Sequence, residues 1–248
     1  MKITKTFIII LLFIVFNIKY SYSQEKNREL RVNFSNFVSI GINTIDIKNF
    51  DKILIKNNYL PFSENTFFIG TGNRGVVDKL ILGGEGNFSI EKKNINNFNN
   101  HINYLTSSTN IIGNIGYIFY EKNNLAIYPL LGIGLSRLSF DFIKNESIGK
   151  IDNILKNPDR GSRIENYGLI LDIGLEGGYL IPIGKSENKK GGIAIGSRFG
   201  YILTLYQTGL RFRDFNIEEV PDISFNGFYI KFLAGFTGSI IPTLIDLL

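Results

Sequence analysis

Large apolar residues alternate with small or polar residues along most of this chain. In residues 167–183, the clearest example, large apolar side chains share one face: Tyr167, Leu169, Leu171, Ile173, Leu175, Tyr179 and Ile181. The other face carries small and acidic residues: Gly168, Asp172, Gly174, Glu176 and Gly178. A period of two predicts a β-strand, and this one exceeds the length of about 5–6 residues that is usual in globular proteins. The segment is long enough to cross a membrane and protrude from it.

Two further segments repeat the pattern, with apolar faces made by Ile193, Ile195, Phe199, Tyr201, Leu203 and Leu205 and by Phe228, Ile230, Phe232, Ala234 and Phe236. Less regular strands are predicted at residues 36–47, 64–71, 78–91, 105–121 and 124–143. The sequence therefore predicts an all-β chain of eight strands. In residues 48–59, Phe50, Ile53 and Leu54 instead fall at helical spacing before Pro61. We expect a short helix in this first long connection, where it caps or plugs the barrel mouth; the alternative is a helix that binds a partner.

The connections between these strands alternate between long and short. Turn chemistry marks the short ones at residues 72–75, 122–124 and 184–189, and polar residues dominate the long ones at 92–103, 144–163 and 207–222. Transmembrane barrels have short periplasmic turns and long outer loops. The alternation predicts a single-domain, antiparallel, up-and-down transmembrane β-barrel of eight strands over residues 36–239.

The N-terminus has the features of an export signal. Lys2 and Lys5 precede an apolar run at residues 7–16, and Ser21 and Ser23 stand at the −3 and −1 positions of a cleavage site before Gln24. The run is too short to span a bilayer as a helix. We expect a cleavable signal peptide at residues 1–23, a periplasmic segment at 24–35 and a C-terminal tail at 240–248.

Composition narrows the chemistry further. The chain has no cysteine and a single histidine, His101, which excludes disulfides, cysteine zinc sites and multi-histidine metal sites. We expect no metal and no cofactor. Loss of Lys2, Lys5 and Lys19 with the signal peptide lowers the formal charge from +5 to +2, so the charge gives no support for nucleic-acid binding.

Charged residues on the small, polar faces are the candidate site residues. Five of them are expected to meet in the lumen: Glu85, Asp172, Glu176, Arg198 and Lys231. In a closed interior such charges must pair, so we interpret them as a structural ion-pair network that blocks an open pore. Acid–base catalysis by Asp172 and Glu176 is the alternative, but four residues along a strand separate them by about 13 Å.

Aromatic residues near the strand ends predict an interfacial girdle. Its expected members are Tyr117, Tyr167, Tyr179, Tyr201, Phe228 and Phe236. The alternative is ordinary core packing in a soluble barrel.

Together, the export signal, the eight strands, the alternating loop lengths and the aromatic strand ends resemble the small outer-membrane β-barrels of Gram-negative bacteria, of the OmpA transmembrane-domain and OmpX type. The resemblance implies an outer-membrane location with both termini in the periplasm, and it brings no catalytic motif. Members of this class usually end at an aromatic residue of the last strand. Here Phe236 is the best candidate, and the chain continues to Leu248.

These features favour a non-enzymatic protein: an envelope component surrounded by outer-membrane lipid, or an accessory subunit whose long loops contact a larger outer-membrane complex. One alternative is a lipid-modifying enzyme similar to lipid A deacylases, using His101 with Ser107, Ser108 and Glu91. Others are a secreted, lipocalin-like carrier of a small apolar ligand and a narrow channel.

Overall fold

The computed structural model describes residues 32–56, 61–97, 100–144, 161–183, 191–212, 215–216 and 223–240. The predicted signal peptide, residues 24–31 and the tail from residue 241 onward lie outside these ranges. In the described part of the chain, no helix has the length and hydropathy needed to span a bilayer.

Eight long strands dominate the described residues: β1 (Val32–Thr44), β2 (Asn65–Val77), β3 (Leu80–Asn97), β4 (Asn100–Tyr117), β6 (Leu125–Lys144), β7 (Gly161–Ile183), β8 (Gly191–Gln207) and β11 (Gly227–Ile240). The shorter elements are α2 (Lys48–Lys56), β5 (Tyr120–Lys122), β9 (Arg211–Phe212) and β10 (Phe215–Asn216). β1 begins before the predicted start of the barrel at residue 36.

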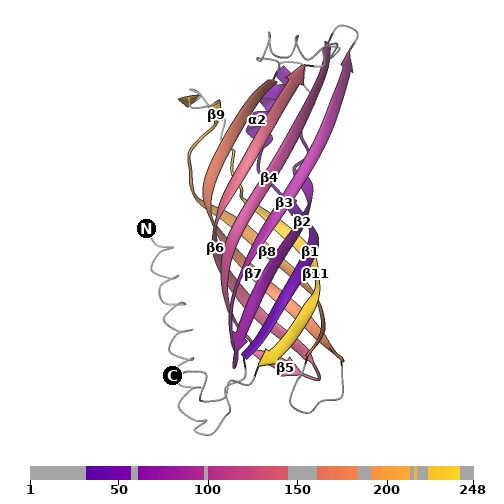
Figure 1. Ribbon diagram of the computed structural model, residues 1–248. Coiled ribbons are helices and arrows are strands. Elements are labelled where there is room, and N and C mark those ends of the chain that lie inside the picture. Colours follow the sequence, from indigo (N-terminus) through magenta and orange to yellow (C-terminus); the bar gives the residue numbers. More distant parts are fainter. Residues whose placement is uncertain are drawn as a thin grey trace.

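Antiparallel pairing closes the long strands into a ring (Figure 1). The order is β7-β8-β11-β1-β2-β3-β4-β6, and β6 pairs with β7 to complete the circle. The first and last strands meet along their length, from Val32 opposite Ile240 to Asn43 opposite Tyr229. The predicted all-β, eight-stranded antiparallel barrel is therefore confirmed, and with it the architectural resemblance to small outer-membrane barrels.

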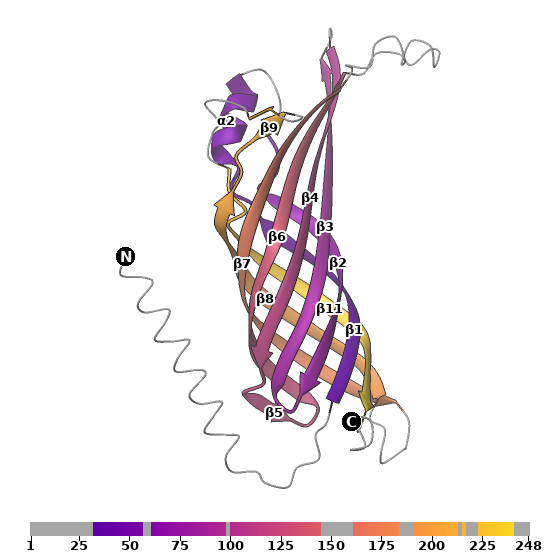
Figure 2. The ribbon, with the colours of Figure 1, turned by 60° about the vertical axis from the view of Figure 1, so that its left-hand side comes forward.

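The two ends of the barrel differ. At one end, here called the turn end, β1 starts, β11 ends and a two-residue turn at Asp78 and Lys79 joins β2 to β3. Figures 1 and 2 show α2 at the opposite end, here called the capped end.

Side chains alternate between the outside and the lumen along the long strands, except at an irregularity between β7 and β8 where the consecutive residues Leu205 and Tyr206 are both exposed. In β11, Phe228 and Phe236 are 70% and 72% exposed, whereas Tyr229, Lys231 and Leu233 are buried. An apolar belt of exposed side chains surrounds the barrel: Val38, Ile40, Ile42, Phe67, Ile69, Leu82, Phe88, Ile111, Ile115, Ile133, Leu135, Ile173, Ile195, Phe199, Ile230 and Phe232. Monomeric soluble proteins rarely expose such a continuous apolar surface. An apolar exterior around a polar interior is the arrangement of a transmembrane β-barrel.

One side of the barrel is taller than the other. β2 pairs with β3 only as far as Phe68 opposite Ser89, whereas β3 and β4 stay paired to Asn97 opposite Asn100. β6 and β7 likewise remain paired to Ile143 opposite Gly161, beyond the last partner of β8. These extensions of β3, β4, β6 and β7 rise on one side of the capped end (Figure 2). We call them the tall wall, which consists of residues 90–97, 100–107, 139–144 and 161–165.

Two predicted connections are wrong. Residues 92–103, predicted as a long polar loop, are mostly strand, and His101 pairs with Asn96 across the β3–β4 hairpin. Residues 72–75, predicted as a turn, lie inside β2 and pair on both sides with β1 and β3. In both cases the hydrogen bonds gained from neighbouring strands override the weak β-propensity of glycine and asparagine.

The predicted helix forms at Lys48–Lys56 and packs over the barrel mouth. Phe50, Leu54 and Phe62 lie in one buried cluster with Leu138, Phe140 and Ile170 of the barrel and with Leu210, Ile223 and Phe225 of the β8–β11 connection. The Phe140 ring centroid lies 4.5 Å from that of Phe50 and 5.1 Å from that of Phe62. The backbone NH of Phe62 donates to Asp51 Oδ1 at 3.0 Å, which ties the end of this connection to α2. This apolar cap closes the lumen at the capped end.

We expect Phe140→Ala to lower the free energy of unfolding by about 3–5 kcal/mol, because it leaves a cavity at the centre of the cap. Urea-induced unfolding of the protein in detergent measures this loss. The matched control is Ile55→Ala, since Ile55 is 57% exposed on α2 and its truncation should change stability by less than about 0.5 kcal/mol. Equal effects of the two substitutions would contradict the described cap.

Candidate functional site

A cluster of charged residues crosses the middle of the lumen. The five residues predicted to face inward, Glu85 of β3, Asp172 and Glu176 of β7, Arg198 of β8 and Lys231 of β11, are all buried and in contact. Arg198 is at its centre and has no exposed surface. Its guanidinium lies 2.8 Å from Glu176, 3.1 Å from Glu85 and 3.6 Å from Asp172.

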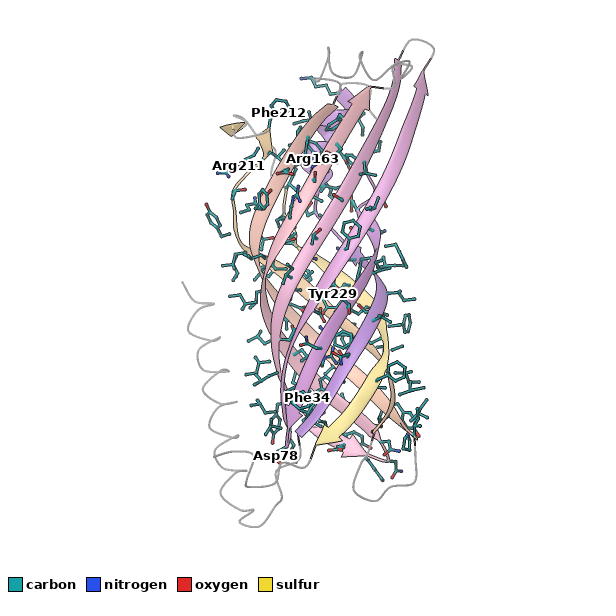
Figure 3. All side chains as sticks on the ribbon, in the orientation of Figure 1. Phe34, Asp78, Arg163, Arg211, Phe212 and Tyr229 are labelled. Carbon is teal, nitrogen blue, oxygen red and sulfur yellow. The ribbon has the colours of Figure 1, made fainter. Side chains whose placement is uncertain are left out.

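The remaining contacts extend this cluster. Lys231 Nζ donates to Glu85 Oε1 at 2.5 Å. The hydroxyl of Tyr229 donates to Asp172 Oδ1 at 2.7 Å. In Figure 3, Tyr229 is labelled at mid-height, within the barrel. Because the cluster joins strands from around the ring, it fixes their relative register as well as filling space.

Arg74 and Tyr128 belong to the same cluster, and the sequence prediction missed both. The Arg74 guanidinium binds the Glu176 carboxylate with two hydrogen bonds, one of them from Nη2 to Oε2 at 2.8 Å. The Tyr128 hydroxyl donates to Glu176 Oε1 at 2.6 Å, and Arg74 also stacks over the Phe37 ring at 4.4 Å. The glycines on both sides of Arg74 predict a turn there. Phe68, Gly70 and Gly72 face inward at alternate positions of β2. Continuing this alternation by two residues assigns Arg74 to the lumen.

Charge balance explains how the cluster can be buried in the lumen. Three cations, Arg74, Arg198 and Lys231, face three carboxylates, and a buried charge is tolerated only when it is paired and hydrogen-bonded. Asp172 and Glu176 both contact Arg198, so they are arranged as ion-pair partners and not as a carboxylate dyad. Within the described ranges, no group of three or more metal-ligating side chains is placed to hold a metal ion.

Between the charged cluster and the cap lies a small polar chamber. It is lined mainly by polar side chains: Asn43, Glu85, Asn87, Ser89, Ser108, Asn110, Asp172, Tyr229 and Lys231. Its volume is about 20 Å³, little more than the space for one water molecule. Pockets for small organic ligands measure about 300–1,000 Å³. This chamber is therefore too small for the apolar ligand that a lipocalin-like carrier would hold.

The expected girdle residues fall into two groups. Tyr117, Tyr179 and Phe236 lie toward the turn end, where β4, β7 and β11 finish. Phe228 lies at the capped end of β11, and its ring meets that of Tyr201 edge-on at 4.7 Å. Tyr167 lies toward the capped end of β7, and its hydroxyl donates to Glu165 at 2.7 Å. Membrane barrels carry aromatic girdles at both interfaces, and the assignment of these six residues to such girdles stays a prediction.

The histidine–serine pair of the enzyme alternative is not assembled along β4. His101 and Ser107 lie six residues apart on this strand, which corresponds to about 20 Å. Ser108 faces the opposite way, into the chamber. A histidine base must approach its serine to within about 3 Å, so these residues do not form a catalytic pair.

Comparison with known proteins gives structural likeness only. Neither protein-family models nor curated proteins give a match. Among solved structures, the chain is similar to Ail, the attachment invasion locus protein of Yersinia pestis, in complex with the heparin analogue sucrose octasulfate. The two chains are 10% identical with a TM-score of 0.42, and the match covers 86% of this chain and 100% of Ail. It is also similar to a major outer membrane protein from Thermus thermophilus, at 10% identity and a TM-score of 0.44, covering 84% and 99%. Neisserial surface protein A gives 14% identity and a TM-score of 0.34, covering 83% and 95%. The fold itself is established by the strand pairing.

We expect Lys231→Met to lower the free energy of unfolding by about 3–5 kcal/mol, because it leaves Glu85 with less compensating charge in the lumen. Adding Glu85→Gln should recover part of that loss, since it removes the uncompensated carboxylate. Urea titration in detergent compares the free energies of unfolding of the variants, and heat-dependent gel migration measures the folded fraction at each urea concentration. Lys122→Met is the control, because Lys122 is exposed at the turn end. A double variant less stable than the sum of both single changes would argue against an ion-pair role.

Proposed function

We propose that this protein is a non-enzymatic component of the outer membrane that docks a partner in the cell envelope through its capped end. The observation that carries the proposal is the tall wall. Four strands continue toward the capped end beyond the last pairs of β2 with β3 and of β8 with β7.

Membrane residence is supported by the two surfaces of the barrel. The outside is an apolar belt with aromatic residues at both ends, and the inside is filled by paired charges. In a closed barrel every backbone group of the ring has a partner, which is what hydrocarbon demands. Export to the outer membrane agrees with the signal peptide expected at residues 1–23.

Partner docking is supported by what the capped end presents. Beyond Ser89, β2 no longer pairs with β3, and the backbone NH of Ser63 donates to Glu91 Oε2 at 3.2 Å. Extended strands at the rim of a sheet can pair with a segment of another chain. Ile55 adds an apolar side chain on the outer face of α2. These groups suit a protein partner better than a small substrate.

A role without catalysis is supported by the use of the polar residues. The lumen carboxylates are engaged by Arg74, Arg198 and Lys231, and the chamber beside them has no room for a substrate.

The absence of cysteine allows a clean topology test with two single-cysteine variants, Ile55→Cys at the capped end and Lys122→Cys at the turn end. In whole cells, we expect a membrane-impermeant maleimide to label Ile55→Cys and not Lys122→Cys. An impermeant maleimide–amine cross-linker should convert Ile55→Cys into one discrete larger species on a gel. The reverse labelling would overturn the orientation, and monomer alone after cross-linking would overturn the docking role.

We expect His101→Ala to leave the acylation pattern of lipid A unchanged, because the backbone of His101 lies about 20 Å along β4 from that of Ser107. Mass spectrometry of lipid A from cells producing the natural protein, the variant or no protein measures this. An acyl chain lost only in cells with the natural protein would instead establish the lipid-modifying enzyme.

A further inference from the structure

On the outside of the barrel, the chemistry changes abruptly where the apolar belt ends at the capped end. On β6, the outward positions Ile133 and Leu135 belong to the belt, and the next outward positions are Arg137, Ser139 and Asp141. On β7, the outward positions beyond Tyr167 are Glu165 and Arg163, opposite Ser139 and Asp141. We call Arg137, Asp141, Arg163 and Glu165 the arginine patch.

The patch is held together by two cross-strand ion pairs. Arg137 binds Glu165, and its guanidinium lies 5.9 Å from the centre of the Tyr167 ring. Arg163 binds Asp141 with two bonds, from Nε at 2.5 Å and from Nη2 at 3.1 Å. The positions of both guanidinium groups are thus fixed by the wall.

The positive groups lie outermost. The arginine side chains are 44% and 59% exposed, whereas the side chains of Glu165 and Asp141 are only 20% and 12% exposed. Arg211 of β9 lies opposite Glu165 in the adjoining pairing, so three arginines stand beside two carboxylates. Figure 3 labels Arg163 and Arg211 at the capped end. A ligand that approaches from the side therefore meets cationic groups first.

A buried polar atom lies beneath these side chains. Ser139 is 2% exposed, and its Oγ has no hydrogen-bond partner among the described residues. It faces the same side as the two arginines, between them along the strand pair. The patch thus combines oriented cations with an unsatisfied hydroxyl.

The place of the patch indicates its ligand. Directly beyond the hydrocarbon belt, a barrel is surrounded by lipid headgroups, and their anionic groups are mainly phosphates. A guanidinium has five N–H donors in a planar fork, so one that binds a carboxylate along one edge keeps donors for a phosphate on another.

We propose that the arginine patch binds the phosphate of a lipid headgroup in the membrane leaflet at the capped end. This inference rests on the proposed membrane residence and adds to it a specific lipid site. The site would seat the barrel at a fixed height and hold one lipid beside β6 and β7.

The test uses the full protein in nanodiscs of zwitterionic lipid, to which bisphosphorylated lipid A or its dephosphorylated form is added. Native mass spectrometry counts retained lipid over a range of concentrations. We expect the phosphorylated form to bind at least tenfold more tightly, and the double variant Arg137→Gln/Arg163→Gln to lose that preference. Lys122→Gln, at the turn end, should keep it.

Two further measurements separate loss of the phosphate site from loss of folding, and a lipid ligand from a free anion. Arg163→Lys retains the charge but loses the planar fork, so we expect it to weaken binding by severalfold even if the double variant folds poorly. Inorganic phosphate, added at the same concentrations, should fail to displace the lipid. Displacement by phosphate would overturn the lipid assignment, because the site would then recognise the free anion.

Equal binding of both lipid A forms would overturn the inference, as would full binding by a folded double variant. Either result leaves the proposed membrane residence intact when Ile55→Cys is still labelled from outside the cell. Reverse labelling would instead overturn the orientation, and loss of the cross-linked species would overturn the docking role.

Discussion

The requirement that every backbone hydrogen-bonding group find a partner inside hydrocarbon determines the rest of this structure. An unpaired peptide group costs several kcal/mol in a bilayer, so an extended chain can cross only as a closed ring. The pairing of β11 with β1, from Val32 to Asn43, supplies that closure. Once the ring is closed, the period of two assigns every side chain to lipid or lumen. The apolar belt and the charged cluster are therefore two results of the same constraint.

Closure with eight strands also fixes what the lumen must contain. A ring of this size leaves an interior that side chains just fill, and here three cations and three carboxylates occupy it together with the aromatic side chains of Tyr128 and Tyr229. Each ion pair joins different strands, as Arg198 of β8 does with Glu85 of β3. A slip of one residue in β2, β3, β7, β8 or β11 would move a charge from the lumen to the lipid. The cluster thus penalises misaligned strands more strongly than an apolar filling would.

Features of the fold and of the charged cluster that depend on neighbours along one segment could be predicted from the sequence. Features that depend on contacts between distant segments could not. The eight strands and the five lumen charges follow from alternation along single segments. Arg74 does not, because Gly72 and Gly75 beside it favour a turn, and only pairing with β1 and β3 holds them in a strand. Residues 92–103 are a second such case. Their many asparagines predict a loop, but the segment forms strands, and the β4 part pairs with β6, which lies outside the β3–β4 hairpin. The cap was predicted as a helix, but its contacts with Phe140 and Ile170 join residues far apart in the chain.

The tall wall, unlike the belt, is not explained by the membrane. Lipid accounts for the belt and closure accounts for the lumen, but neither requires β3, β4, β6 and β7 to continue beyond Ser89 and Leu135. On β6, the outward side chains past that level change from Leu135 to Arg137, so this side of the wall enters water or headgroups and not hydrocarbon. On β3, Ile90 is still an exposed apolar residue. The inner face of the wall packs against the cap through Phe140 of β6, with Phe142 and Ile164 beside it. Neither the belt nor ring closure accounts for these residues, which is why we propose that they serve contact with another molecule.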